Sequence, residues 1–249
     1  VLAGKRCKVP VIIHESDMTP GLANKIAIPS ATKVCCNFPE TLEYLPKGKA
    51  VLTGSPIRQE LLSGNKIAAL DLCGFTADKP VILVIGGSLG SVVVNNAVRK
   101  SLPTLLEHFQ VIHLCGKGKT DESLNGTEGY CQFEYVKDEL RDIFALADLV
   151  ISRAGANAIC ELLALRKPNL LIPLSAKASR GDQILNARSF ERQGFSMVIE
   201  EEELTPESLL EAVQQLYEDR GTFIDAMRNS DQQDSIDTII SLIEEASEK

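Results

Sequence analysis

The stretch VILVIGGSLGS, residues 81–91, decides the fold class of this chain. It is an apolar run that ends in the glycine-rich sequence GGSLG, and a helical pattern follows directly. A run that is apolar at every position is typical of a parallel strand covered on both faces. Glycines let the backbone approach a ligand closely, and the free N–H groups of a helix start favour an anion. The stretch therefore predicts a strand, a helix, and between them a loop over residues 86–90 that holds an anion such as a nucleoside diphosphate.

An ordinary tight turn without a ligand is the alternative for this loop. The GK[ST] sequence of a Walker loop is missing after it, and so is the spacing of the dinucleotide fingerprint. The rest of the site therefore has to come from other segments.

The same alternation of apolar runs and helical patterns extends along the whole chain. Strand-like runs occupy residues 9–14, 31–37, 49–54, 81–87, 109–116, 130–136, 147–155, 168–174 and 195–201. Helical patterns occupy residues 91–107, 138–146, 156–165, 183–193 and 231–249. Repeated strand, loop and helix predict an α/β fold with a doubly wound parallel sheet. A proline and a polar stretch predict a linker near residues 54–64.

Composition excludes several classes of protein. The chain has 249 residues, 44% hydrophobic and 24% charged, which suits one large or two modest globular domains. A net charge of −8 argues against nucleic acid as the main partner, although a local basic patch for a membrane surface stays open. No apolar run approaches the ~20 residues that span a bilayer. The opening VLAGKRCKVP resembles the middle of a domain, so we expect the natural N-terminus to lie upstream.

The cysteines do not suggest a metal or disulfide framework. There are 7 cysteines, none in a CxxC pair, and only 3 histidines. We therefore expect reduced thiols in the core and no zinc site.

A second candidate site segment is ISRAGANAICE, residues 151–161. Arg153 ends a strand, where ligands of open α/β sheets bind. Asn157 and Glu161 share one face of the following helix, and a carboxylate there can accept both hydroxyls of a ribose. An acid that only complements the helix dipole is the alternative.

Three further segments offer polar side chains at strand ends or helix starts. In residues 179–187, Asp182 and Gln183 can bind sugar hydroxyls or simply cap a helix. In residues 11–25, His14 and Glu15 end a strand, where they can serve acid–base chemistry or be structural. Arg58, at the expected domain junction, can reach a diphosphate or be a surface residue.

Taken in order, several segments together resemble one known family, the MurG N-acetylglucosaminyltransferases of peptidoglycan synthesis. These segments are HESDMTPGLANK, TGSPIR, IGGSLGS, HLCGKG, SRAGANAICE and DQILNA, and the resemblance covers nearly the whole chain. It implies a GT-B fold, in which two Rossmann-like domains face each other across a cleft. Residues 1–57 would then be the C-terminal part of the acceptor-side domain, residues 58–231 the UDP-sugar-binding domain, and residues 232–249 a helix that returns to the first domain.

The resemblance also implies an activity. It is the transfer of N-acetylglucosamine from UDP-N-acetylglucosamine to the muramoyl C4 hydroxyl of lipid I, with inversion, to give lipid II and UDP. The family works peripherally at the cytoplasmic face of the cell membrane, without a bound metal or other cofactor. Another GT-B enzyme that uses a UDP-sugar, such as a glycolipid glycosyltransferase or a UDP-sugar epimerase, is the alternative. A UDP-sugar-binding module without activity is a further one.

Finally, the resemblance assigns roles to individual residues. His14 and Glu15 become catalytic candidates beside Asp17, although the GGTGGH loop that carries the usual candidate base is not found in this sequence. Where the family usually has a Gln pair, this chain has Asp182 and Gln183. The implied binding roles are the diphosphate for Gly87, Ser88, Leu89, Gly90 and Arg58, the ribose for Glu161, the uracil pocket for Val136, Arg153 and Ala154, and the sugar for Asp182 and Gln183.

Overall fold

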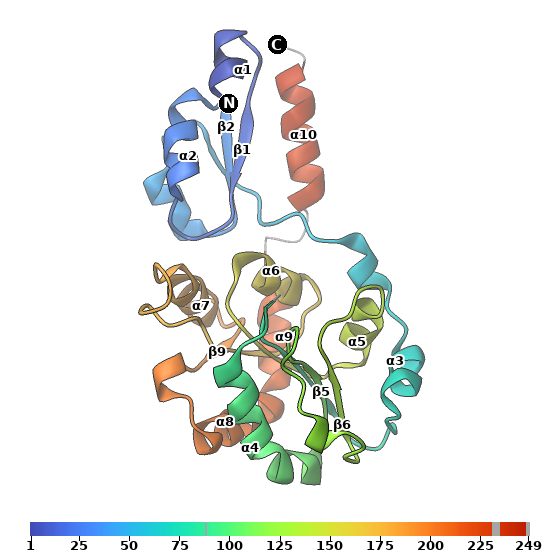
Figure 1. The fold of residues 1–249 in the computed structure, drawn as a ribbon. Coiled ribbons are helices and arrows are strands. Elements are labelled where there is room, and N and C mark those ends of the chain that lie inside the picture. Colours follow the sequence, from blue (N-terminus) through green and yellow to red (C-terminus); the bar gives the residue numbers. More distant parts are fainter. Residues whose placement is uncertain (88, 231–234, 248–249) are drawn as a thin grey trace.

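The computed structural model describes residues 1–87, 89–230 and 235–247, which form two parallel β-sheets with helices around them (Figure 1). The smaller sheet has the order β1-β2-β3, with β1 (Ile12–Glu15), β2 (Lys33–Cys36) and β3 (Ala50–Leu52). The short helices α1 (Leu2–Arg6) and α2 (Leu22–Ala27) accompany it. These residues make up the upper part of the molecule in Figure 1.

The larger sheet is six-stranded, parallel throughout, and has the order β6-β5-β4-β7-β8-β9. From β4 the chain first moves outward to β5 and β6, and it then returns to the other side of β4 to form β7. The order therefore reverses between β4 and β7, and open α/β sheets bind ligands at such a switch point. The strands are β4 (Val81–Ile85), β5 (Gln110–Leu114), β6 (Tyr130–Phe133), β7 (Leu149–Ser152), β8 (Asn169–Leu171) and β9 (Met197–Val198).

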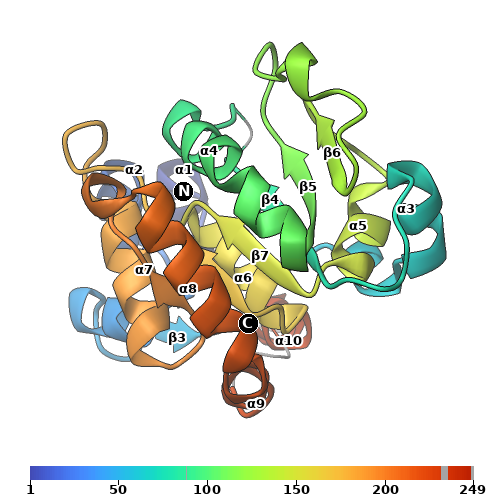
Figure 2. The same ribbon diagram turned by 90° about the horizontal axis from the view of Figure 1, so that it is seen from below.

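Side-chain alternation along β4 explains why its sequence is apolar at every position. Val81 and Leu83 join the core on one face of the sheet, while Ile82 and Val84 join the core on the other face. Helices α4 (Val92–His108) and α8 (Pro206–Glu218) cover the second face and lie side by side in Figure 2. The first face is covered by α3 (Lys66–Cys73), α5 (Leu140–Leu146), α6 (Ala156–Ala164), α7 (Asp182–Arg192) and α9 (Arg220–Arg228).

The last helix, α10 (Ser235–Ser247), lies beside the smaller sheet rather than the larger one (Figure 1). Its Ile239 and Ile243 line an apolar groove together with Ile13 of β1. At its start, the Ser235 hydroxyl donates a hydrogen bond of 2.8 Å to the carbonyl oxygen of Ser55. The chain therefore passes between the two parts twice, once after β3 and once before α10.

The two parts pack directly against each other along α7. The Phe38 ring meets Phe190 edge-on, with ring centroids 5.9 Å apart, and Met18 also joins the larger core. Glu40 accepts a hydrogen bond of 2.9 Å from Ser189 and forms an ion pair with Arg192. Burial alone would raise the pKa of Glu40, but its bonds to Arg192 and Ser189 outweigh burial and lower that pKa. Glu40 is therefore ionised when it makes this contact.

The predicted α/β fold with a doubly wound parallel sheet is confirmed, and each strand-like run of the sequence overlaps an observed strand. Within the described ranges, no helix is long and apolar enough to cross a membrane.

Candidate functional site

The loops that follow β4 and β7 are joined at the switch point by the side chain of Arg153. Its guanidinium donates 2.7 Å to the Ser91 hydroxyl, 3.0 Å to the Ile172 carbonyl and 3.1 Å to the Pro173 carbonyl, and it pairs with Glu201. Arg153 is only 8% exposed. It therefore ties the carboxyl ends of three neighbouring strands together, which is a supporting role.

The glycine-rich loop owes its shape to close backbone contacts. Gly87 and Gly90 adopt φ values of 86° and 68°, which favour glycine. A side chain on Gly90 would also overlap the carbonyl oxygen of Cys115. The loop ends at Ser91, whose hydroxyl caps α4 by accepting a 3.3 Å hydrogen bond from the Val94 amide. Ser88, a predicted diphosphate residue, lies outside the described residues.

Lys119 fixes the far end of the same loop. Its ammonium donates 2.7 Å to the Leu89 carbonyl and 3.1 Å to the Gly90 carbonyl. The sequence analysis did not single out Lys119, although it lies just after the quoted segment HLCGKG. The loop therefore has a positive charge beside it as well as the start of α4, and both favour an anion.

Glu161 and Arg58, predicted separately, are found together. The Arg58 guanidinium donates from Nε and Nη2 to the two carboxylate oxygens of Glu161, over 3.0 Å and 3.3 Å. The Glu161 side chain is 18% exposed and that of Arg58 is 51% exposed. A ligand that uses Glu161 therefore competes with Arg58 for the carboxylate.

Arg58 also lines a pocket of about 510 Å³ with the segment that follows β6. Val136 and Tyr135 belong to that pocket, as do Leu61 and Arg141. An aromatic ring and aliphatic side chains beside backbone groups suit a flat heterocycle such as a base. The pocket opens next to the Glu161 pair because Arg58 belongs to both.

Arg153 and Ala154, predicted to share a pocket with Val136, are not brought together with it in the structure. Ala154 is fully buried, and the Arg153 guanidinium is directed at the carbonyls and carboxylate described above. Within the described part of the chain, neither residue lines the pocket that holds Val136. A strand-end arginine was expected to face the ligand, but here the backbone carbonyls of Ile172 and Pro173, just after β8, bind it.

Asp182 and Gln183 start α7 and already have partners. Asp182 accepts 3.3 Å from the Thr19 hydroxyl and pairs with Arg180 at 2.7 Å. The Gln183 side-chain oxygen accepts 3.0 Å from the Leu174 amide, so Gln183 can still offer its amide N–H groups to a sugar.

Asn186, one turn further along α7, is a residue that the sequence analysis missed. It is fully buried, and its Oδ1 accepts 3.0 Å from the Met18 amide. Its Nδ2 donates 3.1 Å to Asp17 and 3.3 Å to the Ala154 carbonyl. Asn186 therefore links the smaller part to the loop after β7. The available signal in the sequence was an asparagine four residues after Asp182, on the same helical face.

His14 and Glu15 lie at the end of β1, as predicted, but their contacts are structural. Glu15 is 4% exposed and accepts hydrogen bonds from the amides of Asp17 and Gly21 and from the Asn24 side chain. The His14 Nε2 lies 3.0 Å from the Gly54 carbonyl, beside the α10 groove. These contacts favour support of the loop after β1 over the predicted acid–base role.

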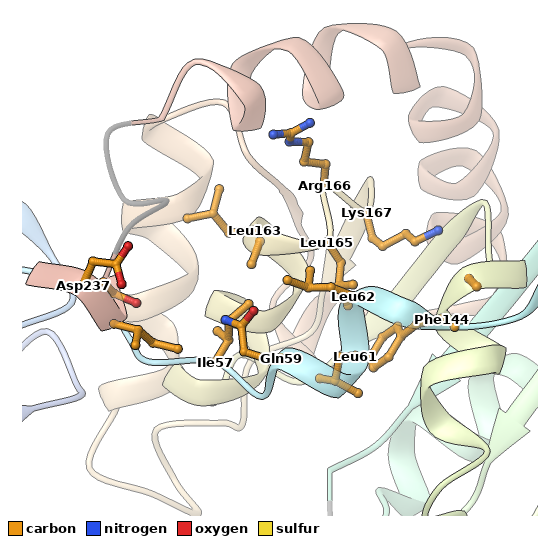
Figure 3. A pocket seen from close by; sticks show the side chains of 15 residues that line it. Ile57, Gln59, Leu61, Leu62, Phe144, Leu163, Leu165, Arg166, Lys167 and Asp237 are labelled. Atoms are coloured by element: carbon orange, nitrogen blue, oxygen red, sulfur yellow. The ribbon is translucent and has the colours of Figure 1, made fainter. Parts of the chain in front are cut away.

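A larger pocket, of about 730 Å³, lies elsewhere (Figure 3). Ile57 and Gln59 of the first crossing line it, together with Asp237 of α10 and Leu163 near the end of α6. Because α6 has nine residues, its end is about 13 Å from its start at the switch point. This pocket shares Leu61 with the pocket beside Arg58, but neither the described part of the glycine-rich loop nor Glu161 lines it. No cluster of metal-binding side chains occurs in the ranges that the structure describes.

Comparison with known proteins agrees with this geometry. Residues 81–242 match the Glycosyltransferase family 28 C-terminal domain. The chain is 69% identical over 247 residues to the UDP-N-acetylglucosamine–N-acetylmuramyl-(pentapeptide) pyrophosphoryl-undecaprenol N-acetylglucosamine transferase of Lachnospira eligens, covering 99% of the chain and 70% of that protein. Its identity to the transferase of the same name from Lachnoclostridium phytofermentans is 68%, over 98% of the chain and 69% of that protein.

Solved structures show the same fold at lower identity. The crystal structure of Acinetobacter baumannii MurG has a TM-score of 0.72 and 23% identity, over 98% of this chain and 69% of that one. A calicheamicin glycosyltransferase has a TM-score of 0.64 and 14% identity, over 95% of this chain and 66% of that one. The expected GT-B architecture is confirmed by these neighbours. The chain belongs to glycosyltransferase family 28 and, within it, to the MurG family of N-acetylglucosamine transferases.

Proposed function

We propose that this chain acts in the transfer of N-acetylglucosamine from UDP-N-acetylglucosamine to the muramoyl C4 hydroxyl of lipid I, giving lipid II and UDP. One observation carries the donor half of this proposal. At the switch point of the larger sheet, the glycine-rich loop lies at the start of α4, and the Glu161–Arg58 pair borders the Val136 pocket. These are the groups that a nucleoside diphosphate sugar needs.

Each part of the donor then has a proposed partner. The diphosphate binds the amides of the glycine-rich loop, with Arg58 released from Glu161 to join it. The ribose hydroxyls donate to the Glu161 carboxylate, and uracil binds in the pocket beside Val136. The sugar extends toward Asp182 and Gln183 at the start of α7.

The chemistry follows from this placement. The acceptor hydroxyl oxygen attacks the anomeric carbon, the bond from that carbon to the diphosphate oxygen breaks, and UDP leaves with the electron pair. Amide dipoles and the Lys119 cation near the loop stabilise the charge that develops on the departing diphosphate. The proton of the attacking hydroxyl passes to a base. His14 and Glu15 stay predictions for that role, and the hydrogen bonds of Glu15 count against it.

A lipid-linked acceptor requires that the enzyme reach a membrane. We therefore propose peripheral contact with the cytoplasmic face of the cell membrane. Helix α1 supports this proposal, because Leu2 is 63% exposed and Lys5 and Arg6 lie in its last turn. Exposed apolar and basic side chains together suit an anionic bilayer surface.

The test is an assay with UDP-N-acetylglucosamine labelled in the sugar, with and without lipid I. Label in lipid II together with release of UDP supports the transferase. Conversion of the sugar nucleotide without an acceptor would indicate an epimerase instead. Binding of UDP without labelled lipid II and without a converted sugar nucleotide would indicate a binding module without activity.

A further inference from the structure

Beneath the glycine-rich loop lies a buried row of polar side chains that the reaction itself does not use. His113, in the middle of β5, is fully buried. Its Nδ1 is 3.0 Å from the Tyr130 hydroxyl, and its Nε2 is 3.0 Å from the Asn95 side-chain oxygen. Asn95 in turn donates 2.9 Å from Nδ2 to the carbonyl of Cys115. We call Tyr130, His113 and Asn95 the polar relay.

The hydrogen bonds of the polar relay fix the tautomer of His113. Because the Asn95 amide nitrogen donates to Cys115, its oxygen faces the ring, and an amide oxygen can only accept. The Nε2 atom of His113 must therefore carry the proton. The Nδ1 atom is then the acceptor, and the Tyr130 hydroxyl donates to it. The direction of both hydrogen bonds of the His113 ring is thus defined.

The end of the polar relay is the turn that supports the loop. The Cys115 carbonyl lies so close to Gly90 that even a methyl group there would overlap it. On the other side of the turn, a side chain on Gly116 would meet the Leu89 carbonyl and the Gly90 backbone. The position of the Cys115–Gly116 turn therefore determines where the backbone of the glycine-rich loop can lie.

We propose that His113 is a positioning residue for the diphosphate of the donor. By orienting Asn95, it holds the Cys115 carbonyl and so keeps the loop amides where the diphosphate binds. This inference rests on the proposed function of the loop. It implies that His113 affects binding of the diphosphate part of the donor and does not affect binding of the nucleoside part.

The test compares UDP with uridine as ligands, by calorimetry on the whole chain. Changing His113→Leu removes the donor to Asn95, and we expect UDP to bind about tenfold more weakly while uridine stays within about twofold. His113→Gln places an amide N–H near the former Nε2 and should restore most of the UDP affinity. Tyr130→Phe is the matched control. It removes a buried hydrogen bond and lowers the melting temperature, but it keeps the link from His113 to Asn95 and therefore the preference for UDP.

An unchanged ratio of UDP to uridine affinity in folded His113→Leu would overturn the proposal, and so would a Gln variant no better than Leu. Should His113→Leu fail to fold, Asn95→Asp keeps the acceptor for His113 but loses the donor to Cys115. It should show the same selective loss of UDP, and an unchanged ratio there would also overturn the proposal. If the unaltered chain binds UDP no better than uridine, the proposed function of the loop fails, independently of the polar relay.

Discussion

Replacing Glu161 by alanine tests the donor site most directly, because this carboxylate has two competing partners. In the structure it is paired with Arg58, and in the proposed complex it accepts the ribose hydroxyls. The variant therefore removes two interactions with opposite effects on ligand binding.

Their magnitudes decide the outcome. The Arg58 side chain is 51% exposed, so solvent screens the ion pair, and such pairs are worth about 0.2–1 kcal/mol. Hydrogen bonds to a charged group are worth about 1.5–3 kcal/mol. The net loss for UDP is then about 1–2 kcal/mol, which raises its dissociation constant roughly tenfold. Pyrophosphate never touches Glu161, and it should bind equally well or up to about fivefold more tightly because Arg58 is free.

Calorimetric titration of both ligands into the variant measures these changes. Glu60→Ala is a matched control, because Glu60 is an exposed acid in the pocket with Arg58 but has no proposed ribose contact. It should leave UDP affinity within about twofold. An equal loss for UDP and pyrophosphate in Glu161→Ala would refute the ribose assignment, since the carboxylate would then act through the loop.

Three further changes test the loop, the buried histidine and the contact between the two parts. Gly90→Ala should abolish UDP binding because its methyl group overlaps a carbonyl, whereas Gly118→Ala, at the same φ of 68° but in open space, should leave UDP binding intact in the same titration. Burial lowers the pKa of His113 to about 3, so the folded chain binds fewer protons than the unfolded chain between that pH and about 6.5. The contribution of His113 to the free energy of unfolding is complete above pH 6.5 and falls by about 1.4 kcal/mol per pH unit from there down to about pH 3. Urea unfolding should show this slope for the unaltered chain and lose part of it in His113→Gln. Asn186→Ala leaves the Met18 amide without its buried partner, so it should lower the free energy of unfolding by about 1–3 kcal/mol in the same urea measurement. An unchanged free energy of unfolding would mean that water replaces the side chain.

Much of the fold was predictable because both faces of the larger sheet are covered. That burial makes most of the strands largely apolar runs, so the strands were found without knowledge of their order. Helices α1, α2, α3, α8 and α9 were not predicted. For α8 the signal existed, since Thr205 and Ser208 form a capping box and Pro206 follows the cap.

The segments that form the candidate site were predictable from the sequence, but the contacts between residues of different segments were not. Glycine positions and strand ends are local signals, and they identified the loop and Glu161. Whether Glu161 faces solvent or Arg58 depends on a residue 103 positions away. The same holds for Asn186, whose partner Met18 is 168 positions away. The contacts of Arg153 could not be predicted for the same reason, because the carbonyls that bind it belong to another strand end.

The two covalent connections between the parts limit how the parts can move. Ile57 and Gln59 of the first crossing line the pocket in Figure 3 together with Asp237 at the start of α10, so the two connections lie close together. We therefore expect any separation of the two parts to be smallest at this pocket. Arg58 follows Ile57 in the first crossing, so we expect it to stay near that connection when the parts move. The contact of Met18 with Asn186 is not covalent, so it has to break before the two parts can separate along α7.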